Sequence, residues 1–537
     1  KTEALLVQWQ QAEWIRPLDV GFARLIRELS EEQGERPHPL VLLLAALVSH
    51  QVGRGHVCVD LAHLLADAGH TLSLPPEESV HEPLADSSSS GPDQPKPAEV
   101  LAFVTLPECL SILEKACAVS DGSHTTPLVL NETRLYLRRF WRYEQRIADG
   151  IMHRLALPSA LADPESGPAQ TLSRALGQLF QSSEPVDYQK LACALAARNR
   201  FAVITGGPGT GKTTTVVNLL AAVQAVAGES PERGGRKYRI RLAAPTGKAA
   251  ARLNESIGGA VSRLPLAELP GNVELADIPT RVTTLHRLLG SRPDTRKFRH
   301  NRDNPLLVDI LVIDEASMVD VDLMASVFDA LPANAQLILL GDKDQLASVD
   351  AGAVLGELCQ RALQAHYTPE TSEWLAAMTG SQIPETLVDA TGQPMDQAVA
   401  MLRKSYRFRE DSGIRAFAEA VNTNSLDSAM LRRIREAAFD DVILLNGQSG
   451  KPDPEDTLDL VCRHAITGSP EAFRNAGQGR HVNGRNLPPP VGYRHYLEPL
   501  QNHGLNENNP REDWDAMAVQ LLEAFSDFQV LCALRKG

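Results

Sequence analysis

The stretch TGGPGTGKTTT, residues 205–215, is the feature that most limits how this chain can fold. An apolar run, FAVIT at 201–205, precedes it, and a helical pattern, TTTVVNLLAAVQAV at 213–226, follows it. Glycines lack Cβ atoms, so the backbone N–H groups of such a turn can point inward, toward an anion at the start of a helix. The strand–turn–helix unit therefore predicts a phosphate-binding α/β domain.

Three further apolar runs have the length of buried strands: YRIRLAA (238–244), DILVID (309–314) and QLILLG (336–341). Longer helical patterns separate them. Parallel strands that are buried on both faces have this nearly continuous apolar composition. We therefore expect an open α/β sheet, flanked by helices, whose ligands bind at the carboxyl ends of its strands.

The loop residues predict a site for ATP and Mg²⁺. Their spacing matches G-x-x-x-x-G-K-[ST], in which Lys212 reaches the β- and γ-phosphates and the Thr213 hydroxyl ligates Mg²⁺. Upstream, the amide of Gln189 could read the donor and acceptor edge of adenine, although an ordinary polar residue at a helix start is the simpler interpretation. The predicted nucleotide-binding residues are Gln189, Gly206, Gly207, Pro208, Gly209, Thr210, Gly211, Lys212, Thr213 and Thr214.

Residues after later strands complete the predicted catalytic set with Lys212. Asp314 could hold Mg²⁺ through water, and Glu315 could orient and deprotonate an attacking water, which suits hydrolysis of a nucleoside triphosphate. Gln345, in GDKDQ, could hydrogen-bond the γ-phosphate and that water. Arg407, in LRKSYRF, could supply a cation to the transferring phosphoryl group across a domain cleft, although a surface basic run is the simpler interpretation.

Two short segments are candidates for nucleic-acid contact. The net charge of −14 argues against binding through bulk positive charge, but it leaves room for a channel lined locally by the basic stretches 233–252 and 292–302. Segment 244–250 lies within the first stretch and segment 283–290 adjoins the second, and both offer groups to phosphates, such as backbone N–H, hydroxyl and ammonium groups. The predicted DNA-binding residues are Pro245, Thr246, Gly247, Lys248, Thr284 and His286.

The rest of the chain predicts several parts around this domain. Leu40–Val48 is the longest apolar run, too short to cross a bilayer, and predicts a buried helix. PLVLNETRLYLRRFWRYEQRIA predicts a strand, a turn, a second strand and a helix. The scattered cysteines indicate free thiols and a cytoplasmic location. The expected parts are an amino-terminal domain (1–125) with a disordered insertion (74–99), a connector (126–185) with a loose stretch (158–185), a first ATPase domain (186–395) and part of a second domain (396–537).

Six motifs together resemble those of superfamily 1 DNA helicases of the RecD type: GGPGTGKTTT, APTGKAAARL, TLHRLLG, LVIDEASM, LGDKDQLASVDAG and LRKSYRF. The likeness covers about residues 189–408. It extends more loosely to LDVGFARLI, GHVCVDL and RLYLRRFW near the start, and to FQVLCALRKG at the end. This outer similarity favours the members that belong to RecBCD, exodeoxyribonuclease V, over the stand-alone members.

The resemblance implies two RecA-like P-loop domains after a mainly helical amino-terminal domain. It implies an ATP-driven 5′→3′ motor on single-stranded DNA that acts in double-strand-break repair and recombination, loading at the 5′ end of a duplex terminus. It further implies a heterotrimer with RecB-like and RecC-like subunits, onto which the amino-terminal domain docks. The nuclease is expected on a partner, because the chain has no convincing Asp…Glu-x-Lys cluster.

Two motifs of superfamily 1 motors are absent from these residues: a V-H-K-S-Q-G-like segment that touches DNA, and a segment with a second arginine for the γ-phosphate. Residues 474–495 show no element that the pattern predicts. Because the predicted catalytic residues are all in place, we expect the sequence to be part of a longer polypeptide. Two alternatives stay open: an ATP-binding regulatory subunit without productive turnover, and a stand-alone RecD-like helicase.

Overall fold

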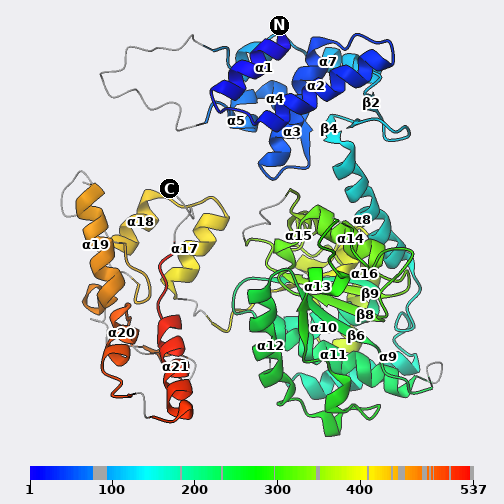
Figure 1. The fold of residues 1–537 in the computed structure, drawn as a ribbon. Helices are drawn as coiled ribbons and strands as arrows, with labels where there is room; N and C mark the ends of the chain where they lie inside the picture. The colour runs from blue at the N-terminus through cyan, green and yellow to red at the C-terminus, as the bar shows by residue number, and fades with distance from the viewer. Residues whose placement is uncertain are drawn as a thin grey trace. The chain divides into compact units, whose positions relative to one another are not determined.

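The structure is a computed structural model in which the chain divides into two compact units, Lys1–Lys404 and Ser405–Gly537 (Figure 1). The first unit contains the amino-terminal helices and a large parallel sheet. The described residues are 1–76, 94–181, 184–230, 234–295, 297–345, 351–407, 411–436, 439–444, 454–473, 480–482, 485–487, 489–506 and 509–531.

The amino-terminal domain is built around helix α3 (Pro39–Gly53), whose residues 40–51 are all buried. A helix that is apolar on every side is stable only when other elements surround it. Helices α1 (Thr2–Gln11) and α2 (Pro17–Glu32) pack along it, which confirms the predicted buried helix. The remaining helices are α4 (Leu61–Ala66), α5 (Ala68–Leu72), α6 (Pro97–Leu101) and α7 (Leu106–Lys115).

A small sheet completes this domain, and it confirms the predicted strand–turn–strand unit. Strands β3 (Leu128–Asn131) and β4 (Arg134–Leu137) pair antiparallel, and helix α8 (Arg138–Ala156) follows directly. The sheet order is β1-β4-β3-β2, with β1 at Cys58–Asp60 and β2 at Val119–Ser120. The amino-terminal sheet therefore takes strands from both sides of residue 125.

The segment for which disorder was expected, 74–99, has folded ends. Residues 77–93 lie outside the described part of the chain. Leu74 is buried, α6 begins at Pro97, and Trp9 Nε1 donates a hydrogen bond to the Pro95 carbonyl at 2.9 Å. The expectation was wrong for these flanks, because a buried leucine and a bond to a buried indole fix them to the domain.

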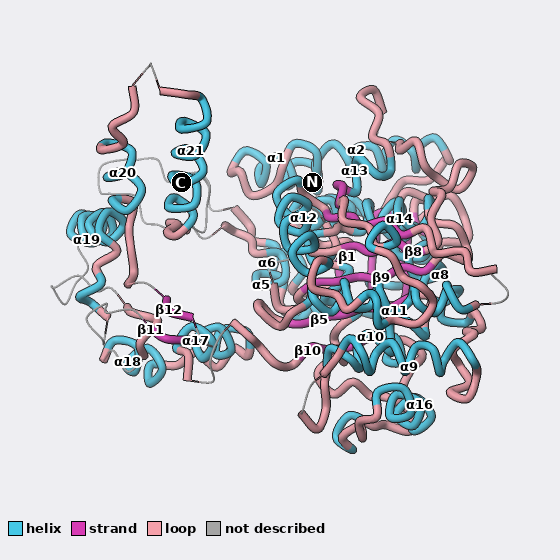
Figure 2. Tube along the Cα trace, turned by 90° about the horizontal axis from the view of Figure 1, so that it is seen from below, coloured by secondary structure: helices cyan, strands magenta, loops and turns pink. Residues whose placement is uncertain are grey.

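The central sheet of the first unit has six strands, all parallel, in the order β10-β5-β9-β8-β6-β7. All four predicted strands are present, and the sheet lies between helices (Figure 2). The prediction of a parallel α/β sheet is confirmed. The strands are β5 (Phe201–Gly206), β6 (Ile240–Ala244), β7 (Val282–Thr284), β8 (Ile310–Ile313), β9 (Gln336–Gly341) and β10 (Val399–Leu402).

Alternate residues of the strands other than β7 enter two different cores, as the pleat of a strand requires. Ala202 and Ile204 of β5 pack in one core, whereas Phe201 and Val203 pack in the other. The domain therefore has three layers. Helices α9 (Gly167–Leu179), α10 (Tyr188–Arg198), α11 (Lys212–Glu229), α12 (Gly247–Val261) and α16 (Pro369–Thr379) contribute to the first core. Helices α8, α13 (Leu285–Leu289), α14 (Val321–Ala330) and α15 (Val354–Leu358) contribute to the second.

Helix α9 lies within residues 158–185, where the sequence suggested a loose linker. Ser166 caps the helix, since its Oγ accepts a hydrogen bond from Ala169 N at 3.3 Å. Leu172 and Leu176 are fully buried, and the helix packs against α11. The linker prediction was wrong here because an apolar stripe at helical spacing outweighs the flanking Pro, Gly and Ser residues.

The second unit is mainly helical among its described residues. Its described strands, β11 (Arg480–Val482) and β12 (Arg485–Leu487), form an antiparallel pair in the region where the sequence predicted no element. That this unit is part of a second RecA-like domain stays a prediction. Its helices are α17 (Gly413–Asn422), α18 (Ser428–Arg435), α19 (Pro454–Thr467), α20 (Arg494–Gln501) and α21 (Arg511–Ser526).

No helix in the described ranges combines the length and the apolar character that a bilayer crossing requires. The cysteines of these ranges are all free thiols. Cys109, Cys193 and Cys359 are buried, whereas Cys462 is exposed; Cys532 lies outside the described residues.

Candidate functional site

The phosphate loop connects the end of β5 to the start of α11. Gly209 and Gly211 have φ angles of 74° and 82°, which side chains other than glycine rarely adopt. A Cβ on Gly206 would lie 2.9 Å from Leu402 Cβ, so the packing against β10 also requires glycine. Gly211 is the N-cap residue of α11 and has no side chain to cap it. The first N–H groups of the helix are therefore available to an anion.

The Lys212 side chain lies along the inside of this loop. Its Nζ donates to the carbonyls of Gly206 and Gly207 at 2.6 and 3.2 Å. Thr210 Oγ1 also donates to the Gly207 carbonyl, at 2.8 Å. These bonds fix the loop in the curved form that backbone N–H groups need in order to surround a phosphate.

Gln189 is brought to the same loop from the first turn of α10. Its Nε2 donates to the Thr210 carbonyl at 3.0 Å, and a Cβ on Gly211 would lie 2.1 Å from that nitrogen. Among the other predicted residues of the loop and helix start, Pro208 and Thr214 are exposed, and Thr213 is half-buried. The structure thus places the amide predicted to read the base directly beside the residues predicted to hold the phosphates.

Asp314 and Glu315 follow β8, two strands away from β5. Glu315 N donates to Asp314 Oδ1 at 2.9 Å, and Glu315 has a left-handed backbone with φ 52°. Burial raises the pKa of Asp314 to about 6; the hydrogen bond from Glu315 and the Lys212 ammonium oppose the shift, and the Glu315 charge adds to it. A carboxylate that burial destabilises in this way gains from a nearby cation.

The donor set fits Mg²⁺. Asp314 offers carboxylate oxygens and Thr213 offers a hydroxyl in the first turn of α11, and hard divalent cations prefer oxygen ligands. Asp314 is half-buried, and the raised pKa that desolvation gives it means that a nearby cation would favour its ionised form.

Gln345 lies in the turn that follows β9, the strand between β5 and β8. Thr205 of β5 is the register partner of Gly341, and its Oγ1 accepts a hydrogen bond from Lys343 N at 3.2 Å. Ser317, in the turn after Glu315, donates through Oγ to Gln345 Oε1 at 3.5 Å. The turn after β9 is therefore bonded both to the end of β5 and to the turn after β8.

Sequence reasoning missed Thr205 and Ser317. Thr205 is a polar residue at the end of an apolar run, and Ser317 comes three positions after Asp314. Each position was visible in the sequence, but the contact partner of each depends on which strands are neighbours in the sheet. Arg407 belongs to the second unit and is exposed, and its predicted role stays a prediction.

The two predicted DNA segments are neighbours at the carboxyl edge of the same sheet. Ala244, at the end of β6, is the register partner of Thr284, at the end of β7. Thr246 and Thr284 cap α12 and α13, since their Oγ1 atoms accept hydrogen bonds from Ala249 N at 3.2 Å and Arg287 N at 3.3 Å. Each hydroxyl keeps its hydrogen for another acceptor, such as a phosphate oxygen.

The side chains around these caps face solvent. Gly247 and Lys248 are exposed in the first turn of α12, beside the half-buried Pro245. His286 is exposed as well, and its ring meets Phe298 edge-on with centroids 5.8 Å apart. Within the two basic stretches, Arg233 and Arg296 lie outside the described residues.

Two protein families match separate parts of the chain. The N-terminal domain of the RecBCD enzyme subunit RecD matches residues 11–136, and an AAA domain matches residues 189–351. The first match covers the helices around α3 and the small sheet. The second begins at Gln189 and includes the phosphate loop, the carboxylate pair and Gln345.

Curated relatives extend over both parts. The RecBCD enzyme subunit RecD of Haemophilus influenzae is 34% identical over 417 residues, which cover 77% of this chain and 61% of the relative. The RecD subunit of Mycolicibacterium smegmatis is 35% identical over 421 residues, covering 78% and 60%. The ATP-dependent RecD2 DNA helicase of Deinococcus radiodurans is 36% identical over 231 residues, covering 43% and 27%.

The chain spans about three fifths of the length of these two RecD relatives. Within that span, the RecD amino-terminal domain is followed by the AAA domain that carries the site described above. With a match to the RecD N-terminal domain and relatives of this name over most of its length, the chain belongs to the RecD family.

Proposed function

We propose that the chain is an ATP-dependent motor that moves 5′→3′ along single-stranded DNA, as a helicase subunit of a RecBCD-type helicase–nuclease. The proposal depends above all on one observation: the phosphate loop, the Asp314–Glu315 pair and Gln345 occupy the ends of three neighbouring strands. The two candidate DNA segments end the next strands of the same sheet. This arrangement supports a link between nucleotide hydrolysis and the grip on DNA.

In this proposal each residue of the nucleotide site has a separate task. Gln189 reads the adenine edge, and the donors of Lys212, which contact the loop carbonyls in the structure, turn to the β- and γ-phosphates. Glu315 orients the attacking water and accepts its proton. When bound to Asp314 and Thr213, Mg²⁺ supplies positive charge that neutralises the phosphates during transfer.

Gln345 would report on the γ-phosphate. Its side chain contacts Ser317 in the turn after Glu315, so loss of the phosphate changes the hydrogen bonding of both turns. Strand β8 lies between β9 and β6, and β6 ends in the segment that carries Lys248. We infer that the strand ends pass the state of the nucleotide to the DNA-contacting segments, and that Arg407 completes the site from the second unit.

The partners we propose are a RecB-like and a RecC-like subunit in a cytoplasmic heterotrimer, with single-stranded DNA from the 5′ end of a duplex terminus. The match of residues 11–136 to the RecD N-terminal domain supports this over a stand-alone helicase. Gel filtration of the protein with the two candidate subunits tests it. A single peak containing all three chains is expected, and separate elution would favour the stand-alone alternative.

Lys212→Gln tests the motor itself. Removing the ammonium should lower DNA-stimulated ATP hydrolysis by about 100-fold or more, because the glutamine cannot neutralise phosphate charge. The circular dichroism spectrum should match the wild type, since Lys212 is not part of a hydrophobic core and its two bonds are confined to the loop. Lys115→Gln, the same change at an exposed lysine in the last turn of α7, is the matched control and should hydrolyse ATP normally.

The alternative of a regulatory subunit that binds ATP without turnover predicts a different result. In a single-turnover experiment with the wild type and labelled ATP, the motor releases phosphate when single-stranded DNA is added. Stable retention of intact ATP with DNA present would refute the motor and support the regulatory role.

A further inference from the structure

The chain passes from the first unit to the second directly from strand β10, at the edge of the sheet. β10 pairs with β5 so that Leu402 is opposite Gly206, the last residue before the phosphate loop. Leu402 is buried, and Arg403 and Lys404 are the last residues of the first unit. The connection to the second unit therefore starts beside the strand end that leads into the phosphate loop.

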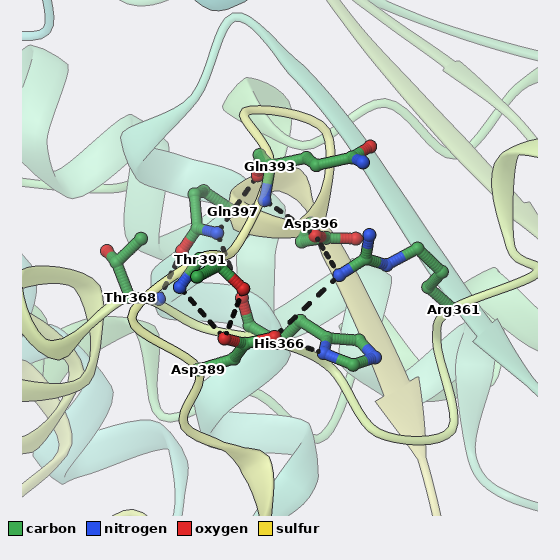
Figure 3. Close-up of polar contacts among 8 residues, drawn as sticks. All are labelled: Arg361, His366, Thr368, Asp389, Thr391, Gln393, Asp396 and Gln397. Atoms are coloured by element: carbon green, nitrogen blue, oxygen red, sulfur yellow. Dashed lines mark hydrogen bonds and ion pairs between the residues drawn. The ribbon is translucent and has the colours of Figure 1, made fainter.

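The beginning of β10 is fixed by a polar cluster (Figure 3). Arg361 forms ion pairs with Asp396 at 3.2 Å and with Asp389 at 3.9 Å, and Tyr367 OH donates to the carbonyl of Val399, the first residue of β10, at 3.0 Å. The cluster folds the chain that precedes the strand. Its members are Arg361, His366, Thr368, Asp389, Thr391, Gln393, Asp396 and Gln397.

The chain at the end of β10 is held by contacts of Arg403 and Lys404, which lie beside the predicted nucleotide site. The Arg403 guanidinium lies over the ring of Tyr188, 5.4 Å from its centroid, and donates to the Leu363 carbonyl at 2.5 Å. Lys404, the next residue, forms an ion pair with Glu184. Tyr188 is the first residue of α10, and Glu184 lies in the chain just before the helix. Arg403 and Lys404, which we call the connecting segment, are therefore bound to the amino-terminal end of α10.

That end of α10 also carries the residue predicted to read the base. Gln189 directly follows Tyr188, and its amide donates to the Thr210 carbonyl of the phosphate loop. A base that binds Gln189 must fix the first turn of α10, and Arg403 contacts the residue beside it. The connecting segment thus has two attachments to the nucleotide site, one through the backbone of β10 and one through Arg403.

We propose that Arg403 is a positioning residue that couples nucleotide occupancy to the second unit, by holding the connecting segment against Tyr188 at the edge of the base site. This inference rests on the proposed motor function. Arg403 touches neither the reacting atoms nor DNA in this scheme. Its loss should therefore spare nucleotide binding and basal hydrolysis, and it should weaken the response of hydrolysis to DNA and the distance moved per ATP.

The test uses Arg403→Gln, Arg403→Lys and Tyr188→Leu in the full-length protein. Three quantities are measured: the Kd for a fluorescent ATP analogue, ATP hydrolysis with and without single-stranded DNA, and ATP consumed per nucleotide travelled. Arg403→Gln and Tyr188→Leu should each lower the stimulation by DNA by about fivefold, the change expected from one cation–π contact. Arg403→Lys, which keeps the cation, should restore most of it, and the double variant should be no worse than either single variant.

Arg361→Gln is the control for a merely structural effect. It removes the cation of the polar cluster without touching Tyr188, so it should lower the melting temperature while the ATP consumed per nucleotide stays normal. The inference is overturned if DNA stimulates hydrolysis by Arg403→Gln as strongly as it does for the wild type. It is also overturned if Arg361→Gln loses as much of this stimulation as Arg403→Gln does. Failure of the motor proposal looks different, because the wild type itself would then show no stimulation by DNA.

Discussion

At the scale of a single residue, Asp314 is suited to its proposed chemical role but lowers the stability of the folded protein. Burial at the end of β8 raises its pKa to about 6 from the usual 3.8, so the folded state disfavours the ionised form. The proposed role requires that ionised form near a cation. Asp314 therefore lowers the free energy of unfolding whenever the cation is absent.

Asp314→Asn should stabilise the protein in the absence of divalent cations. Because the pKa of Asp314 is raised in the folded state, its ionisation does not destabilise the protein below about pH 4. The destabilisation grows between about pH 4 and pH 6 and is fully present above that. At pH 8 we expect the free energy of unfolding to rise by about 1–3 kcal/mol, because the pKa of Asp314 is about 6 in the folded protein instead of the usual 3.8. Urea unfolding in EDTA at pH 4 and pH 8 measures it, with the exposed Asp303→Asn as control. An equal effect of Asp314→Asn on unfolding at both pH values would contradict the electrostatic explanation. ATP hydrolysis by this variant should be lost whatever its stability.

The sequence predicted most of this residue-level site, but not its internal contacts. The spacing around Lys212 and the apolar strand before Asp314 predicted that both residues follow strands of one sheet, and the structure places them there. Their roles in hydrolysis stay predictions. The hydrogen bond between Ser317 and Gln345 could not be predicted from the sequence. It joins turns that follow different strands, and only the sheet order brings those turns together.

At the scale of elements, the register of β6 with β7 matters most for the proposed contact with DNA. Because Ala244 is opposite Thr284, the caps of α12 and α13 lie side by side at the sheet edge. Helix starts carry partial positive charge and free N–H groups, which suit phosphates. Lys248, exposed in the first turn of α12, adds a full charge there.

Lys248→Gln should weaken binding to single-stranded DNA by about threefold to tenfold, equally for all base compositions, because a phosphate contact carries no sequence information. The slope of log K against log salt should fall by about 0.7, the loss of one phosphate contact. Fluorescence anisotropy at several salt concentrations measures both. Lys115→Gln, at an exposed lysine of α7 in the amino-terminal domain, should change neither quantity. An unchanged slope in Lys248→Gln would show that Lys248 does not contact a DNA phosphate.

Elements with strong, continuous apolar character were predicted well, and elements with weak local signals were not. β5, β6, β8 and β9 are buried on both faces, so their composition alone identifies them. Helix α9 has Pro and Gly at its start and was taken for a linker. β10 has only the residues VAML, and its identity as a strand depends on pairing with β5, far away in the chain.

At the scale of the whole molecule, the boundary between the units falls between the proposed catalytic residues. Lys212, Asp314, Glu315 and Gln345 belong to Lys1–Lys404, whereas Arg407 follows the boundary by a few residues. An arginine supplied from a separate body acts only when the bodies close on the nucleotide. Hydrolysis would then be sensitive to the second unit even if nucleotide binding is not.

Arg407→Ala should lower the maximal rate of DNA-stimulated hydrolysis by about 100-fold or more, with the nucleotide Kd changed by less than about threefold. Stopped-flow phosphate release and titration with a fluorescent ATP analogue separate the two quantities. Arg432→Ala, at an exposed arginine of α18 in the same unit, is the matched control and should behave as the wild type. Parallel losses of affinity and rate would indicate a binding role for Arg407 instead.

The pairing of β10 with β5 has a consequence for how the protein is made. The core around α3 contains only residues that precede 138, so it can close early while the ribosome is still translating. β5 becomes an inner strand only after residue 402 has emerged, roughly ten seconds or more later at about 5–20 residues per second. During that interval the nascent chain exposes an apolar strand edge that invites misassembly, and we expect chaperones to protect it.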